Sequence, residues 1–206
     1  MSTSTSTSTS TSTSMSDALC PPLNTTAQLD PTAKLDPTAK LDTKALRAAF
    51  AQFATGVTVM TSQTHAPCGM TANAFTSLSM DPPLALVCVA QSAAMHAAVL
   101  RARVFGVSVL AADQEGHACY FADRTRPRGA AEFDGIAWHP GPQTGVPLLA
   151  GALARLECRL TDVHRGGDHS IFVGEVVGFT HGAPTAAEAL IFHRGGFHRL
   201  PTRRPA

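Results

Sequence analysis

Short stretches of apolar and β-branched residues, separated by turn residues, dominate the chain after residue 42, and this pattern is typical of strands. Residues 57–61 alternate and predict a first strand. Residues 69–80 alternate between polar and apolar positions, which indicates one strand with a wet face and a dry face. Residues 84–90 form a continuous apolar run of strand length, suited to burial on both faces, and residues 104–110 predict a further strand.

Two hairpins are predicted toward the C-terminus, because glycines stand between stretches of strand character. Residues 165–168 (Arg-Gly-Gly-Asp) form the first turn, and Gly195-Gly196 form the second. The strands expected to flank these turns are residues 155–164 with 170–180, and residues 189–193 with 197–200. Residues 124–147 are rich in Arg, Gly and Pro, so we expect this segment to be irregular.

Helical spacing predicts a few short helices. Asp42 or Thr43 can cap the first, which Gly56 ends, while Ser92 can cap the second and Asp113 the third. Short strands linked by tight turns cannot supply the crossovers of a parallel sheet. The predicted fold class is therefore mainly β, a closed or nearly closed antiparallel barrel with helices over its openings.

The first 41 residues differ in character from the rest. Residues 1–14 are Met followed by alternating Ser and Thr, and the segment LDPTAK occurs at 29–34 and again at 35–40. Neither stretch has an apolar face that could offset the entropy of ordering. We predict a disordered low-complexity arm over residues 1–41 and one domain over residues 42–201. A mobile tail is the expectation, and an arm that wraps a dimer is the alternative.

Composition and charge narrow the choice of partner. The 206 residues include 16 basic and 15 acidic side chains, a net charge of +1, which argues against broad electrostatic binding to nucleic acid or to an anionic membrane. No apolar run approaches the roughly 18 residues of a membrane span, and the N-terminus lacks the parts of a secretory signal. We therefore expect a cytoplasmic protein. The five cysteines form no CxxC pair and the nine histidines show no metal-ligand spacing, so we expect reduced thiols and no metal.

Common catalytic signatures are missing, but six segments resemble, in order, the flavin reductase family. The sequence has no GxGxxG after a strand, no Walker A lysine, no GxSxG elbow and no HExxH. The six segments are ALRAAFAQFATGVTVMTS at 45–62, GMTANAFTSLSMDPPLALVCVA at 69–90, FGVSVLAADQ at 105–114, GVPLLAGALARLEC at 145–158, GGDHSIFVGEV at 166–176 and LIFHRGGFHRL at 190–200. Together they cover essentially all of residues 45–200.

The resemblance implies both a fold and an activity. The fold is the FMN-binding split barrel, an antiparallel Greek-key β-barrel with a few short helices. The activity is that of an NAD(P)H:flavin oxidoreductase of the EC 1.5.1 type, in which NADH or NADPH passes hydride to N5 of FMN or FAD. Family members form homodimers, and many supply the reduced flavin to a separate monooxygenase. Such catalysis consists largely of placing two rings together, which agrees with the missing nucleophile.

The resemblance places the flavin against residues 71–77 and the start of the second helix. A flavin ring needs small side chains that expose backbone groups, and its phosphate needs a positive site such as a helix N-terminus. The flavin-binding residues expected are Thr71, Ala72, Asn73, Ser77, Ala90, Gln91, Ser92 and Phe121, with Gln91 and Ser92 near the phosphate. The pattern alone is also explained by an amphipathic strand, a helix cap and a core aromatic.

The GGDH segment at 166–169 is implied by the resemblance to lie beside the nicotinamide cofactor. His169 would help to position NADH or NADPH, and Asp168 would orient the turn or the imidazole. Arg194, in the last hairpin, would approach the phosphates of the flavin or of the dinucleotide. The alternative is that these are exposed hairpin side chains with no ligand.

Two other functions stay open. The chain could be a flavin-binding or haem-binding split-barrel module that catalyses nothing, or a flavoenzyme that acts on its own organic substrate. Turnover of NAD(P)H with free flavin tests the first alternative. Activity in the absence of any partner monooxygenase tests the second.

Overall fold

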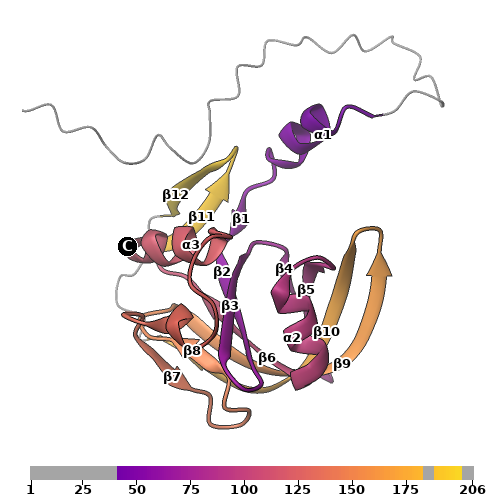
Figure 1. The fold of residues 1–206 in the computed structure, drawn as a ribbon. Coiled ribbons are helices and arrows are strands. Elements are labelled where there is room, and N and C mark those ends of the chain that lie inside the picture. Colours follow the sequence, from indigo (N-terminus) through magenta and orange to yellow (C-terminus); the bar gives the residue numbers. More distant parts are fainter. Residues whose placement is uncertain (1–40, 183–187, 201–206) are drawn as a thin grey trace, which may run out of the picture. The chain divides into compact units, whose positions relative to one another are not determined.

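The computed structural model describes residues 41–182 and 188–200 (Figure 1). The chain divides into two compact units, Met1–Phe50 and Ala51–Ala206. The arm expected over residues 1–41 lies outside the described residues, apart from Leu41. Helix α1 (Thr43–Phe50) belongs to the first unit and begins as predicted, because Lys44 N donates to Asp42 Oδ1 at 2.8 Å. It ends at Phe50, earlier than Gly56.

The second unit is built mainly of strands. The strands are β1 (Thr55–Gly56), β2 (Thr58–Gln63), β3 (Pro67–Ala72), β4 (Phe75–Met80), β5 (Pro83–Ala90), β6 (Val104–Val109), β7 (Trp138–Pro140), β8 (Pro147–Leu149), β9 (Ala154–Gly166), β10 (His169–His181), β11 (Ala189–His193) and β12 (Gly196–Leu200). The helices and 3₁₀ turns are α2 (Ala94–Ala102), η2 (Ala112–Gln114), α3 (Glu115–Ala122) and η3 (Gly129–Phe133). The segment expected to be irregular, residues 124–147, therefore contains η3, β7 and the first residue of β8.

A seven-stranded antiparallel sheet forms the framework, in the order β3-β2-β6-β9-β10-β5-β4. Figure 1 shows it curving around α2, and the first strand, β3, also contacts β5 near the other end of the order. Strands β1, β11 and β12 form a second sheet, and β7 pairs with β8. The prediction of a mainly β, antiparallel fold with few short helices is confirmed.

The predicted single strand over residues 69–80 is wrong. The chain breaks at Asn73-Ala74, so that β3 pairs with β2 while β4 pairs with β5, at opposite ends of the sheet order. A register shift between Ser77 and Ser79 interrupts the alternation of β4. As a result Leu78 and Met80, predicted on the dry face, are 48% and 88% exposed.

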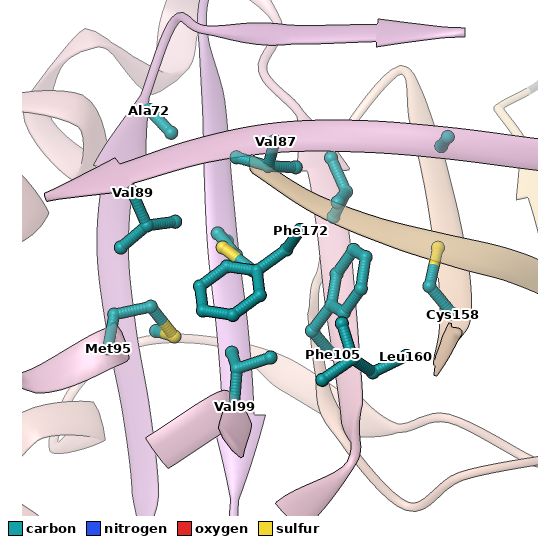
Figure 2. Close-up of a cluster of buried hydrophobic side chains, with 12 residues drawn as sticks. Ala72, Val87, Val89, Met95, Val99, Phe105, Cys158, Leu160 and Phe172 are labelled. Carbon is teal, nitrogen blue, oxygen red and sulfur yellow. The ribbon is translucent and has the colours of Figure 1, made fainter. Parts of the chain in front are cut away.

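The core lies between α2 and the curved sheet. Figure 2 shows the ring of Phe172 from β10 beside Met95 and Val99 of α2 and Val87 of β5. In β5, predicted to be buried on both faces, burial alternates: Ala85, Val87 and Val89 are buried, and Leu84, Leu86 and Cys88 are half-buried. Burial of the α2 side chains holds this helix against the sheet and so fixes the position of its N-terminus.

Both predicted hairpins are present. The turn between β9 and β10 is Gly167-Asp168, where Gly167 has a φ of 64°. The turn between β11 and β12 is Arg194-Gly195, with φ values of 52° and 83°. Positive φ at both central residues is the geometry of a type I′ turn, which matches the twist of the flanking strands.

Two predicted helix caps are wrong. The N-cap of α2 is Ala93, one residue after Ser92, and the N-cap of α3 is Gln114. Asp113 lies inside η2 instead of capping α3. Ser92 was a plausible cap by residue type, but the Ala93 N–H still donates to Ala90 O at 2.9 Å in the turn that leads out of β5, so the helix starts later.

The described cysteines Cys68, Cys88, Cys119 and Cys158 are free thiols. Burial raises the pKa of Cys68 to about 11 and that of Cys158 to about 12. Both thiols are therefore protonated at neutral pH and are poor nucleophiles. None of the helices in the described part of the chain has the length and apolar character that crossing a membrane requires.

Candidate functional site

A pocket of about 310 Å³ lies where β3, the end of β5, the start of α2 and the segment after α3 meet. Its lining residues come from three separate stretches of sequence, within 69–71, 90–95 and 121–128. They are Gly69, Met70, Thr71, Ala90, Ser92, Ala93, Ala94, Met95, Phe121, Ala122, Arg124, Arg126 and Arg128. The lining combines small side chains, one aromatic ring and three arginines.

Contacts between β3 and α3 build the first wall. Thr71 Oγ1 donates to Ala118 O at 2.6 Å, which ties the strand to the helix. A Cβ on Gly69 would lie 2.4 Å from the ring of Phe121, so only glycine allows this close approach. Phe121 is 1% exposed and its ring centroid lies 5.2 Å from that of Phe133. Phe121 therefore forms the base of this wall and is largely a core residue.

A buried ion pair fixes the segment after α3. Arg126 Nε donates to Glu132 Oε1 at 2.8 Å, and its other nitrogens donate to Asp123 O at 2.5 Å and to Gly69 O. Gly69 N donates to the same Glu132 oxygen at 3.2 Å. Both side chains are buried. The guanidinium thus joins β3, the end of α3 and η3, and its charge is balanced by a buried carboxylate.

The N-terminus of α2 forms the opposite wall. The N–H groups at the start of a helix have no acceptor inside it and carry the positive end of the helix dipole. In the described part of the chain, the N–H groups of Ser92, Ala94 and Met95 donate to no backbone oxygen. Since all three residues line the pocket, this wall presents N–H donors and small side chains together.

The GGDH turn is attached to the rim of the pocket. In the pairing of β5 with β10, His169 is the partner of Ala90, which lines the pocket. Gln91 N donates to Asp168 O at 2.9 Å, and Gln91 Nε2 donates to His169 O at 3.1 Å and to Gly167 O at 3.4 Å. The segment that leads from β5 into α2 and the turn of the β9–β10 hairpin therefore form one hydrogen-bonded unit.

Two further contacts orient this unit. His96 Nε2 of α2 and Ser170 Oγ of β10 are 2.9 Å apart. His169 Nδ1 lies 2.7 Å from Asp168 Oδ1, and this hydrogen bond lowers the pKa of the Asp168 carboxyl. As Nδ1 is engaged by the carboxylate, Nε2 is the nitrogen of the exposed imidazole left to contact a ligand.

The structure brings together part of the expected site. Thr71, Ala90, Ser92 and Phe121 line the pocket, and Gln91 and His169 are joined to its rim through the turn. The remaining expected residues lie elsewhere. Ala72 is in the hydrophobic core, Asn73 and Ser77 are exposed outside the lining, and Arg194 is on the β11–β12 turn of the other sheet.

Sequence reasoning missed the three arginines of the pocket. Arg124, Arg126 and Arg128 fall in the segment that composition predicted to be irregular. Arginine at every second position marks this segment in the sequence, but the residues form turns and a bend instead of a strand, so the spacing alone does not place their side chains. Cys68 lies near this cluster, where Glu132 adds to the effect of burial on its pKa and Arg126 and Arg128 oppose it.

The pocket is suited to binding a flat, anionic ligand and to holding it in one orientation. The walls offer small apolar side chains, backbone donors and positive charge. In the described part of the chain, no three His, Cys, Asp or Glu side chains are grouped so as to hold a metal ion.

Comparison with known proteins agrees with this geometry. The model of the family described as Flavin reductase like domain matches residues 50–201. An NADH-dependent FAD reductase of Streptomyces globisporus is 48% identical over 155 residues, which cover 75% of this chain and 84% of that protein. The reductase component of a 4-nitrophenol 4-monooxygenase/4-nitrocatechol 2-monooxygenase of Rhodococcus opacus is 42% identical over 159 residues, covering 76% of this chain and 81% of that protein.

A solved structure shows the same fold. BorF, the flavin reductase component of a bacterial two-component tryptophan halogenase, superposes with a TM-score of 0.75 at 50% sequence identity. The match covers 79% of this chain and all of BorF. Residues 50–201, which the family model matches, include every wall of the pocket and both sides of the GGDH turn.

Proposed function

The chain belongs to the flavin reductase like domain family, and on that premise we propose that it is an NADH-dependent flavin reductase, an oxidoreductase of the EC 1.5.1 type. The observation that carries this proposal is the pairing of Ala90 with His169. It joins the pocket wall expected to bind flavin directly to the turn expected to bind the nicotinamide. A hydride donor and a hydride acceptor need this proximity.

The residues of the pocket fit a flavin nucleotide. Ala90, Ala93 and Ala94 leave a smooth apolar surface for a ring, and nearby backbone N–H groups can donate to its polar edge. Ser92 and the N-terminus of α2 can bind a phosphate. Thr71 is held by α3, so it presents a fixed strand edge to the ring. Phe121 supports this wall from below.

The reaction needs positioning more than acid–base chemistry from the protein. Bound flavin, FMN or FAD, supplies the hydride acceptor at N5, and the nicotinamide supplies the hydride. Gln91 holds the backbone of the GGDH turn, and Asp168 holds the His169 ring, so that Nε2 is directed by two independent contacts. We propose that His169 binds NADH, with NADPH as the other candidate, and that Asp168 acts through it.

A homodimer and a protein partner complete the proposal. Strand β4 is an edge of the seven-stranded sheet and exposes Met80 and Leu78, a surface suited to association with a second copy. The Rhodococcus relative is the reductase component of a monooxygenase, so we propose that this chain also supplies reduced flavin to a separate monooxygenase.

The test is a steady-state assay of the full chain with NADH or NADPH and with riboflavin, FMN or FAD. We expect many NADH oxidised per protein molecule with free flavin and with no other protein present. A tightly bound cofactor without turnover would instead identify a binding module. Turnover that requires an organic substrate would identify a self-contained flavoenzyme. Static light scattering, comparing the unchanged chain with Met80→Lys, tests the dimer.

A further inference from the structure

A histidine of α2 contacts the strand that carries His169. His96 Nε2 lies 2.9 Å from Ser170 Oγ, a hydrogen bond in which either group can donate, and the His96 ring lies against that of Phe172 with centroids 5.1 Å apart. His96 is half-buried and Ser170 is 3% exposed. Neither residue is among those that line the pocket. The contact therefore supports the site from outside its ligand-binding surface.

This hydrogen bond joins the two walls at which the two ligands are expected. His96 stands in the first turn of α2, directly after Ala94 and Met95, which line the pocket. Ser170 directly follows His169 on β10. The bond thus ties the helix turn expected to bind the flavin to the strand end expected to hold the nicotinamide.

Alternation along β10 explains how Ser170 can set the direction of His169. Successive side chains of a strand point to opposite faces of the sheet. Ser170 is the partner of the buried Val89 and reaches α2, whereas His169 is the partner of Ala90 and belongs to the opposite face. When Ser170 is held, the strand end cannot rotate freely about its own axis. The imidazole on the other face then keeps one orientation.

The Gln91 attachment of the turn is more exposed to water. Gln91 Nε2 donates to His169 O at 3.1 Å and to Gly167 O at 3.4 Å, and both hydrogen bonds are exposed. Water competes for groups in such positions, so these bonds restrain the turn less. The bond between His96 and Ser170 is part-buried, and a group left unpaired there carries a desolvation penalty. It is therefore the stiffer restraint.

We propose that His96 is a positioning residue for hydride transfer, which acts through Ser170 to hold His169, and with it the nicotinamide, in line with the flavin. The assignment rests on the proposed function, in which a hydride with its two electrons passes from the nicotinamide to N5 of the flavin. His96 touches neither ligand in this role. Its loss therefore leaves both ligands bound and makes their relative placement less precise, which slows the transfer more than it weakens binding.

The experiment is a single turnover without oxygen, in which the full chain with FMN is mixed with NADH and flavin reduction is followed by absorbance. His96→Ala and Ser170→Ala should each lower the limiting rate roughly 3- to 10-fold, the effect of one hydrogen bond. The double substitution should lower it no further, because both changes remove the same bond. The dissociation constant for FMN and the NADH concentration at half the limiting rate should change less than about twofold.

Two further variants separate positioning from a general loss of structure. His96→Gln, whose side-chain amide can take the place of Nε2, should recover most of the rate. His139→Ala removes an exposed histidine on β7 and should match the unchanged chain. Thermal unfolding is measured for every variant. If His96→Ala does not fold, Ser170→Ala, which removes one hydroxyl, is judged by the same rate and affinity criteria.

Three results would overturn the positioning role. These are an unchanged limiting rate in both single variants, a loss confined to FMN affinity, and additive losses in the double variant. If the unchanged chain did not oxidise NADH at all, the proposed function would fall and this role with it. Oxidation at the same rate by the unchanged chain and by the variants would remove the role of His96 alone.

Discussion

Replacing Glu132 by glutamine should destabilise the protein strongly, although the two side chains have nearly the same shape. Glu132 Oε1 accepts from Arg126 Nε at 2.8 Å and from Gly69 N at 3.2 Å, and the carboxylate is 1% exposed. Glu132→Gln leaves the buried Arg126 guanidinium without a counter-charge. Breaking a buried pair in this way costs about 3–5 kcal/mol of the free energy of unfolding.

The assay is urea unfolding followed by fluorescence of the single tryptophan, Trp138, whose ring centroid lies 5.8 Å from that of Phe133, next to Glu132. Arg128→Gln is the matched control, since its pair with Glu132 is partly exposed and should be worth less than about 1 kcal/mol. Arg126→Met combined with Glu132→Leu removes both charges and should recover much of the loss. A loss below about 1 kcal/mol for Glu132→Gln alone would refute this account of the pair.

Three further outcomes are expected. His169→Ala should raise the KM for NADH roughly tenfold and leave FMN affinity unchanged, because the substitution removes a hydrogen-bonding group from the GGDH turn and none from the pocket lining. An unchanged KM would show that His169 does not bind the nicotinamide cofactor. Gly69→Ala should lower the free energy of unfolding by about 1–3 kcal/mol, because the added Cβ would lie 2.4 Å from the ring of Phe121. Gly116→Ala in α3 is the control: its Cβ would meet open space, so the change should be neutral or slightly stabilising. Equal effects of the two substitutions would contradict the packing argument. The free energy of unfolding should fall as pH rises above 9.0, the ordinary pKa of a cysteine thiol, because folding raises the pKa of Cys68 to about 11 and that of Cys158 to about 12. Between these values the thiols ionise in the unfolded chain but stay protonated in the folded one. Urea midpoints measured between about pH 8 and pH 11 should therefore decline less in Cys68→Ala than in the unchanged chain.

Local chemistry was enough to predict the hairpins. The turns at Gly167 and Gly195 need positive φ, and glycine adopts it without strain, so both turns could be placed within a residue or two. The β-branched run of β6 was likewise visible in the sequence. In each case the signal and the structure that it specifies lie within the same few residues.

The division of residues 69–80 could not be found in this way. Alternation continues through Asn73 and Ala74, and only the different partners of β3 and β4 separate the two strands. Partner choice depends on residues far along the chain, and the shift at Ser77 and Ser79 then reverses the alternation. Ala72, which the resemblance places among the flavin-binding residues, lies at the end of β3 and belongs to the core cluster.

The arginines of the pocket were hidden for a related reason. Arginines at alternate positions in an irregular segment are usually solvated. Arg126 is buried instead, because its guanidinium donates to Glu132, which also accepts from Gly69 N. Only the folded chain shows that all three arginines line the pocket, that Arg126 is buried against Glu132, and that Arg124 and Arg128 are exposed. Arg194 shows the converse case, because its HRGG context looked informative and yet the structure places it on a separate sheet.

The pocket is assembled from segments with different partners, and each segment is fixed by contacts that reach beyond the pocket lining. The Arg126–Glu132 pair holds β3 to the segment after α3, burial of Met95 and Val99 holds α2, and Gln91 holds the GGDH turn. A reaction that requires only the correct placement of two rings depends on the stiffness of such contacts more than on any single reactive group. Substitutions that loosen these supporting contacts without unfolding the chain should therefore lower kcat, because the two rings are then held less precisely.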